Sequence, residues 1–158
     1  HTLVAVLVAV SAAGAVTTLA LDSRPARAAL ALWSAALLTL ATAAVLRRIL
    51  NHRVVSLQTI SGALSAYLLI GFLFAALFSA VANLHNGPLF AGGQPANHST
   101  IQYFSFTTMT TVGYGDFAAA GEPTRSLAVL EALIGQIFLV TLVARLVSTL
   151  GQQRTPPG

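Results

Sequence analysis

The sequence predicts an all-α integral membrane protein, with four transmembrane helices and a short re-entrant helix that leads into a loop. Of the 158 residues, 56% are hydrophobic and only 8% are charged, and the mean hydropathy is +0.79. A soluble domain carries roughly a quarter of its residues as charged side chains. Long apolar segments recur along the chain, and a stretch rich in glycine and threonine interrupts them in the second half.

The apolar segments run roughly over residues 2–21, 28–46, 54–82 and 126–150. A helix needs about 20 residues to cross a hydrocarbon core of ~30 Å, and each segment is close to that length or longer. We therefore expect each segment to form one transmembrane helix. The net charge of +4 comes from eight arginines, mostly at segment ends. They indicate orientation in the membrane rather than binding to nucleic acid.

Arginine placement predicts which helix ends face the cytoplasm. With the N-terminus inside, the cytoplasmic arginines outnumber the external ones, and acidic Asp22 and Glu122 lie beside the external positions. This bias agrees with the positive-inside rule. We expect a plasma-membrane protein with both termini in the cytoplasm. The inner set is Arg47, Arg48, Arg53 and Arg154, and the outer set is Arg24, Arg27 and Arg125.

The sequence between the third and fourth segments is of a different kind. Residues 83–98 contain Asn-Gly-Pro, Gly-Gly and Gln-Pro, which are typical of an irregular loop. Ser99 or His98 is a candidate N-cap for a short helix over roughly 100–110. That helix is too short to span a membrane, so we expect it to be re-entrant. It carries the aromatic residues Tyr103, Phe104 and Phe106.

Thr110 to Asp116 read TTVGYGD. Consecutive backbone carbonyls can point to one side and replace the water around a dehydrated cation. Gly113 and Gly115 supply the unusual backbone angles that this requires. The chain contains no second copy of the stretch, so a four-fold ring of carbonyls needs four chains, and we expect a homotetramer. The coordinating carbonyls would belong to Thr111, Val112, Gly113 and Tyr114, with the Thr111 hydroxyl at the inner end.

From Ser99 to Leu150 the sequence resembles the pore domain of potassium channels, specifically the bacterial two-helix pore family. The resemblance implies a tetrameric pore that conducts K⁺ passively, with monovalent cations and membrane lipid as its partners. Residues 1–53 would form two peripheral helices, 54–151 the pore domain and 152–158 a cytoplasmic tail. The pore domain would comprise an outer helix (54–82), a turret (83–98), a pore helix (99–110), a selectivity filter (111–116) and an inner helix (124–151).

The resemblance also assigns roles to single residues. Gly115 and Asp116 would close the outer mouth of the filter, and Gly135 falls at the hinge glycine of the inner helix. The C-terminal end of the pore helix would favour a cation in the cavity below the filter. Residues at helical spacing after Gly135 would line that cavity, namely Gln136, Leu139, Val143 and Val147.

Three positions depart from the family pattern. Bacterial members carry a carboxylate on the pore helix where this chain has Thr107, and often two tryptophans where it has Tyr103 and Phe104. These groups brace the filter, and a filter is only as selective as the shell that supports it. A weakly selective cation channel is therefore the alternative to a potassium channel.

Glu131 is an acidic residue inside the fourth apolar segment. A carboxyl at membrane depth is a candidate functional group. It lies off the face that Gln136 defines, so we expect it behind the filter or toward a neighbouring helix. Either it replaces the missing pore-helix carboxylate, or hydroxyls and backbone amides satisfy it and it only fixes packing.

Acidic residues near the outer mouth suggest control by a divalent cation. Repeated around a tetramer, Asp116 and Glu122 would form an acidic vestibule, and oxygen ligands suit Ca²⁺. Asp116, Glu122 and Glu131 are the candidate ligands, with Ca²⁺ as a candidate regulator, and no cofactor is expected. The alternative is a solvated acidic loop. Arg145, in the fourth segment, is expected to reach the headgroups or pair at a subunit interface rather than gate the pore.

Other classes of protein fit the sequence less well. No nucleophile–base pair, phosphate-binding loop or metal cluster indicates an enzyme. The first two apolar segments contain no internal charge, which argues against a voltage sensor. Potassium transporters usually keep a single filter glycine and hold four repeats in one chain. A non-conducting regulatory subunit of another channel is a further alternative, although an intact filter would then be unnecessary.

Overall fold

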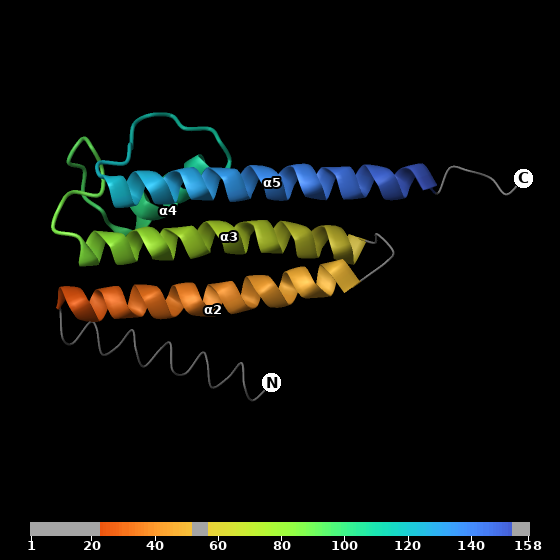
Figure 1. Cartoon of the computed structure of the whole chain (residues 1–158), viewed down its shortest axis with the longest axis horizontal. Helices are drawn as coiled ribbons and strands as arrows, with labels where there is room; N and C mark the ends of the chain where they lie inside the picture. Colours follow the sequence, from red (N-terminus) through yellow and green to blue (C-terminus); the bar gives the residue numbers. More distant parts are fainter. Residues whose placement is uncertain (1–22, 52–56, 153–158) are drawn as a thin grey trace, which may run out of the picture.

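The computed structural model describes residues 23–51 and 57–152, which are helical apart from the connecting loops. Figure 1 shows α2, α3 and α5 running side by side with α3 in the middle, while the short α4 lies against α3 and α5 near one end. The predicted span over residues 2–21 falls outside the described residues. The helices are α2 (Arg24–Asn51), α3 (Leu57–Leu84), α4 (His98–Met109) and α5 (Glu122–Gln152).

Three helices within the described ranges are long and apolar enough to cross a membrane. The crossing segments are Arg24–Arg47, Ile60–Leu84 and Glu122–Arg145. The outer helix ends two residues later than predicted, and the inner helix begins two residues earlier, at Glu122. Pro123 is compatible with that earlier start because the first turn of a helix has no intrahelical use for its N–H.

Small residues form the contact between α2 and α3. Ala28, Ala31 and Ala35 are buried on α2, and Ala63 and Ala66 are buried on α3. Small side chains let two helices approach closely where lipid removes the usual hydrophobic drive for association. The α2 hydroxyls donate to carbonyls of the same helix at 2.7–2.8 Å, so they need no partner in lipid; they belong to Ser34, Thr39 and Thr42.

Asn97 is the N-cap of α4, so the expectation that Ser99 or His98 caps this helix is wrong. The Asn97 side chain accepts from the Thr100 N–H at 2.9 Å, and the Thr100 hydroxyl accepts from the Asn97 N–H at 3.0 Å. This reciprocal pair is a capping box with threonine in the place usually taken by Glu or Gln. The chain therefore turns into the helix one residue earlier than predicted.

The buried core lies at the end of the molecule that holds α4. It joins side chains from α3, from the loop before α4 and from α4 itself. The loop is fastened to the segment after the TTVGYGD stretch, because Ala91 N–H donates to Ala118 O at 2.8 Å and Ala120 N–H to Leu89 O at 3.0 Å. The core residues include Ile70, Phe74, Phe78, Leu89, Phe90, Ile101, Phe104 and Met109.

Candidate functional site

The backbone of the TTVGYGD stretch alternates in handedness. The φ angle is positive at Thr111 (59°), Gly113 (51°) and Gly115 (82°), and negative at Val112 and Tyr114 between them. Positive φ is uncommon for a threonine, and its cost persists only where the surroundings fix the conformation. Alternation of this kind turns successive peptide groups so that their carbonyls can face the same side. The signs of φ along this stretch are those that a carbonyl ladder would require.

The amides of this stretch point back to α4. Val112 N–H and Gly113 N–H both donate to the Thr107 carbonyl, at 3.0 and 3.2 Å, and Thr111 N–H donates to the Thr108 carbonyl at 3.0 Å. These carbonyls belong to the last turn of α4 and would otherwise lack intrahelical partners. With the amides held on the α4 side, the stretch from Thr111 to Asp116 is exposed in the single chain.

Thr107 supports the stretch through its carbonyl and not through its side chain. Its hydroxyl lies 3.0 Å from both the Tyr103 and the Phe104 carbonyl oxygens, so its single proton stays within α4. The position that carries a carboxylate in the resembling family therefore makes no side-chain bond to Asp116 among the described contacts.

A buried polar cluster joins α3, α4 and α5, and its member on α4 is two residues before Thr107. The Ser105 hydroxyl on α4 lies 2.5 Å from Glu131 Oε1 on α5 and 2.8 Å from the Gly71 carbonyl on α3. Ser105 and Glu131 are both fully buried. Glu131 Oε2 has no hydrogen-bond partner within the described ranges. The expectation that Glu131 points toward a neighbouring helix agrees with its contact to Ser105 of α4, and its position behind a filter stays a prediction.

The number of protons available for hydrogen bonds in this cluster indicates whether Glu131 is charged or neutral. A serine hydroxyl donates one hydrogen bond, whereas Ser105 faces two acceptor oxygens. A neutral Glu131 resolves this, because its carboxylic acid proton can go to Ser105 while Ser105 donates to the Gly71 carbonyl. A buried neutral acid with a hydrogen bond also avoids the large cost of an unpaired buried charge.

Aromatic side chains hold the opposite, outer end of the stretch. The Tyr103 ring on α4 stacks on the Tyr114 ring, with centroids 6.4 Å apart and planes 9° apart. Desolvation and a hydrogen bond to the Asp116 carboxylate raise the pKa of Tyr103, so its hydroxyl keeps its proton. Gln94 Nε2 donates to the Asp116 carbonyl at 2.7 Å. Tyr103 thus takes the filter-side position at which the resembling family often has tryptophan.

The rings behind Tyr103 were not anticipated from the sequence. Phe117 meets Tyr103 edge-on at 5.7 Å and Phe90 at 5.0 Å, and Phe90 meets Phe104 at 5.4 Å. Phe104 in turn meets Phe78 on α3 at 5.1 Å. The only available signal was the high share of phenylalanine near the loop, because ring contacts between distant segments leave no periodic pattern.

Gly135 brings α5 against the end of α4. A Cβ added at this glycine would lie 2.6 Å from the Met109 carbonyl oxygen and 2.8 Å from Met109 Cγ. Both are closer than side-chain carbons normally approach, so α5 would have to move. The helix is continuous through this position. The structure thus gives Gly135 a packing role, and its role as a hinge stays a prediction.

The predicted cavity residues lie on α5, most of which is open in the single chain. Gln136, Val143 and Val147 are exposed, and Leu139 is partly buried. Other large apolar side chains of this helix are also more than half exposed, including Val129, Leu133, Ile137 and Val140. A helix of this composition needs lipid or further protein on those faces.

The candidate divalent ligands do not come together in one chain. Glu131 is buried, whereas Asp116 and Glu122 are exposed. Across the described residues, no group of three acidic or histidine side chains is placed to hold a metal ion. A site that combines Asp116 or Glu122 from several chains stays a prediction. Arg145 is partly buried near the far end of α5, where it interacts with its surroundings.

Comparison with protein families identifies the chain as a relative of known channels. Residues 62–152 match the model of a protein family described as ion channel. The match covers more than half of the chain and includes α4, the TTVGYGD stretch and nearly all of α3 and α5. No curated protein and no solved structure matches the chain.

Proposed function

The chain belongs to the ion channel family, and we propose that it forms a homotetrameric potassium channel that conducts K⁺ passively across the plasma membrane. The observation that carries the proposal is the alternating backbone of Thr111 to Gly115, with its amides held by α4. This geometry leaves consecutive carbonyls free to replace the hydration shell of an ion. No group suited to chemical catalysis is needed for this function.

Four copies of the chain account for the exposed faces. Thr111 to Asp116 are exposed in the single chain, and α5 presents a row of apolar side chains with no partner among the described helices. Four-fold assembly would place the carbonyls around one axis and cover part of α5. Non-helical backbone at membrane depth is tolerated only in such protein or water surroundings.

The mechanism rests on electrostatics and position. Each α4 helix contributes about half a negative charge at its C-terminal end, and four such ends would favour a cation below the filter. Gln136 would add a neutral polar ring near that level. In the filter, the carbonyls of Thr111 to Tyr114 would hold dehydrated K⁺ in series, and adjacent ions would move one another forward.

Selectivity requires that the carbonyls keep their spacing. We assign Glu131 to this task as a positioning residue, because it fixes Ser105 on α4, and α4 holds two filter amides through the Thr107 carbonyl. A carboxyl on the inner helix would thus replace the missing carboxylate on the pore helix. Its oxygens are far from the permeation path in this assignment and do not touch the ion.

A weakly selective cation channel is the alternative, and one observation favours it. The Thr107 hydroxyl is engaged within its own helix and leaves Asp116 without a bond from that position. A filter supported at fewer points would admit Na⁺ as well.

The reversal potential decides between the two functions. The purified protein is placed in a planar bilayer with K⁺ on one side and Na⁺ on the other. Reversal near the potassium equilibrium value supports the potassium channel. Reversal near zero, with cations still preferred to chloride, supports the alternative. No cation current from a protein that runs as a monodisperse oligomer would contradict both.

A further inference from the structure

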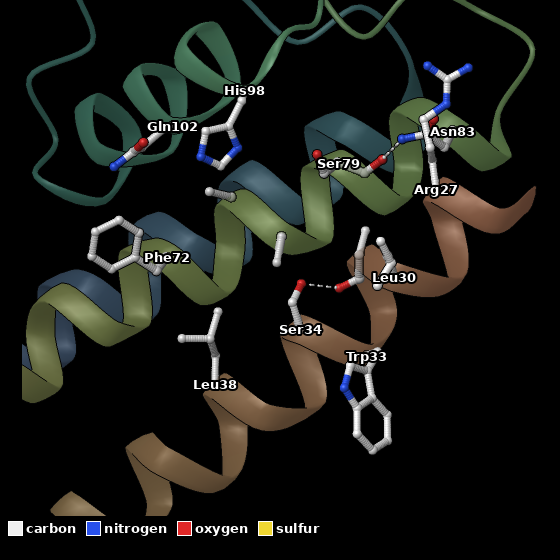
Figure 2. Close-up of a pocket in the computed structure, with 13 residues that line it drawn as sticks. Arg27, Leu30, Trp33, Ser34, Leu38, Phe72, Ser79, Asn83, His98 and Gln102 are labelled. Carbon is white, nitrogen blue, oxygen red and sulfur yellow. Dashed lines mark hydrogen bonds between the residues drawn. The ribbon is translucent and has the colours of Figure 1, made fainter. Parts of the chain in front are cut away.

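A groove on the side of α3 that carries α2 is not used by the proposed conduction mechanism. It lies between α2, α3 and the start of α4 and has a volume of about 550 Å³. Figure 2 shows its walls, with Leu38 and Phe72 toward one end, Arg27 and Asn83 toward the other, and His98 of α4 between them. Figure 1 places α2 on the side of α3 that faces away from α5.

The groove exists because its floor is built from small side chains. Ala31 and Ser34 of α2 and Ala75, Ala76 and Ser79 of α3 line it. Ser34 turns its hydroxyl back to the Ala31 carbonyl at 2.8 Å, so it presents little polar surface. Larger residues at its edges, such as Leu30 and Phe72, leave the centre open.

Polarity changes along the groove in step with membrane depth. Arg27 and Leu38 are eleven residues apart on α2, which corresponds to about 16 Å along a helix. Asn83 and Phe72 have the same separation on the antiparallel α3. Half of a ~30 Å hydrocarbon core is about 15 Å. The polar end therefore sits at the headgroup level when the apolar end reaches the middle of the bilayer.

Arg27 is the one charged side chain among the residues that line the groove, and none of them is acidic. His98 and Gln102 of α4 add polar groups along its length. A ligand with a long apolar part and an anionic head matches both the polarity and the charge. We propose that the groove binds an anionic phospholipid of the surrounding bilayer, with its phosphate beside Arg27 and an acyl chain along Leu38 and Phe72.

The chain offers its own probe for this site. Trp33 lies at the edge of the groove, with its ring turned away from α3 (Figure 2), and is the only tryptophan in the sequence. Its fluorescence can be measured in phosphatidylcholine vesicles that contain increasing amounts of brominated phosphatidylglycerol, since bromine quenches tryptophan on contact. Brominated phosphatidylcholine serves as the comparison. Quenching by the anionic lipid should need a mole fraction about fivefold lower, which is the factor that one arginine contributes near a membrane surface.

Matched variants separate the groove from the general lipid surface. Ala76→Phe fills the groove, whereas Ala36→Phe adds the same ring to an exposed position on α2 outside it. The first should abolish the preference for the anionic lipid and the second should keep it. Arg27→Gln should also remove the preference, while Arg24→Gln, one turn earlier and outside the groove, should not.

Several results would overturn the proposal. Equal quenching by the two brominated lipids in the unaltered protein would show that the groove selects no anionic lipid. Weak quenching by both would mean that residues 1–21 or a neighbouring subunit covers it. Retention of the preference in Ala76→Phe would place the lipid elsewhere. If Ala76→Phe does not fold, as judged by its circular dichroism spectrum, the comparison of Arg27→Gln with Arg24→Gln tests the proposal instead. Neither measurement depends on the ion selectivity of the channel.

Discussion

The two ends of the TTVGYGD stretch are supported by different kinds of interaction. At the inner end, one buried hydroxyl and one buried carboxyl join α4 to α5 and α3, through Ser105, Glu131 and the Gly71 carbonyl. At the outer end, a series of rings runs from Tyr103 through Phe117 and onward to α3. We call these the polar support and the aromatic support.

This difference indicates how each end should respond to change. Ring contacts are individually weak and are shared among several residues, so one conservative change leaves the others in place. The polar support depends on two side chains in a buried site, where a group left without its partner is costly. Removal of a whole buried ring should still cost the most stability, because it leaves a large cavity. Loss of the polar support should instead mainly shift the TTVGYGD stretch.

We expect the largest loss of stability when a buried ring is removed from the aromatic support. Phe90 is fully buried and meets both Phe104 and Phe117. Phe90→Ala should lower the free energy of unfolding by about 3–5 kcal/mol, as for other buried phenylalanines. Thermal melts followed by circular dichroism in detergent measure this. Phe72→Ala, at a 41% exposed ring, is the control and should cost far less.

A smaller loss is expected where α5 approaches the polar support. Gly135→Ala places a methyl group against the Met109 carbonyl and should cost about 1–3 kcal/mol, typical of overpacking. Gly121→Ala is the matched control, because its nearest neighbour is Pro123 Cδ at 3.8 Å, an ordinary contact. Equal melting temperatures for the two variants would show that α5 does not press on α4 in the assembled protein.

The coupling between Ser105 and Glu131 should be about 1 kcal/mol, the usual net value of a hydrogen bond. Glu131→Leu and Ser105→Ala each remove one partner of the pair at 2.5 Å. The double variant should therefore lose less stability than the sum of the two single losses. Strict additivity in the melts would contradict the polar support as a linked pair.

The smallest effect is expected from the phenol of Tyr103. Tyr103→Phe keeps the ring that stacks on Tyr114 and removes only the hydroxyl beside Asp116. Because the folded protein raises the pKa of this phenol, the hydroxyl remains protonated up to a pH above the usual tyrosine range, and its contribution is lost only beyond that. Currents of the wild type and the variant, compared from pH 7 to 9, should differ by a constant factor. A difference that changes over this range would contradict the assignment.

The sequence predicts much of the fold because long apolar segments and the TTVGYGD stretch are local signals. Hydropathy indicated the positions of α2, α3 and α5, and glycines at 113 and 115 indicated the positive φ angles found there. The same reasoning missed Asn97 as the N-cap, because threonine replaces the expected Glu or Gln of the capping box.

Contacts between distant segments account for what the sequence does not predict. The position of Glu131 off the cavity face follows from helical spacing, but its partner Ser105 does not, since the pair depends on how α4 crosses α5. The positive φ of Thr111 is likewise imposed by bonds to α4, because threonine has no intrinsic preference for it.

The central claim is that the buried carboxyl of Glu131 keeps a potassium filter selective in the absence of a carboxylate at Thr107. The most direct test is the reversal potential of Glu131→Leu beside the wild type, with K⁺ opposite Na⁺, together with the double variant Thr107→Glu, Glu131→Leu. Glu131→Gln is the matched control, because its neutral amide can still donate a hydrogen bond to Ser105. We predict that the wild type and Glu131→Gln reverse near the potassium equilibrium value, that Glu131→Leu moves toward zero, and that the double variant recovers part of the shift. A Glu131→Leu channel that reverses at the wild-type potential would contradict the claim.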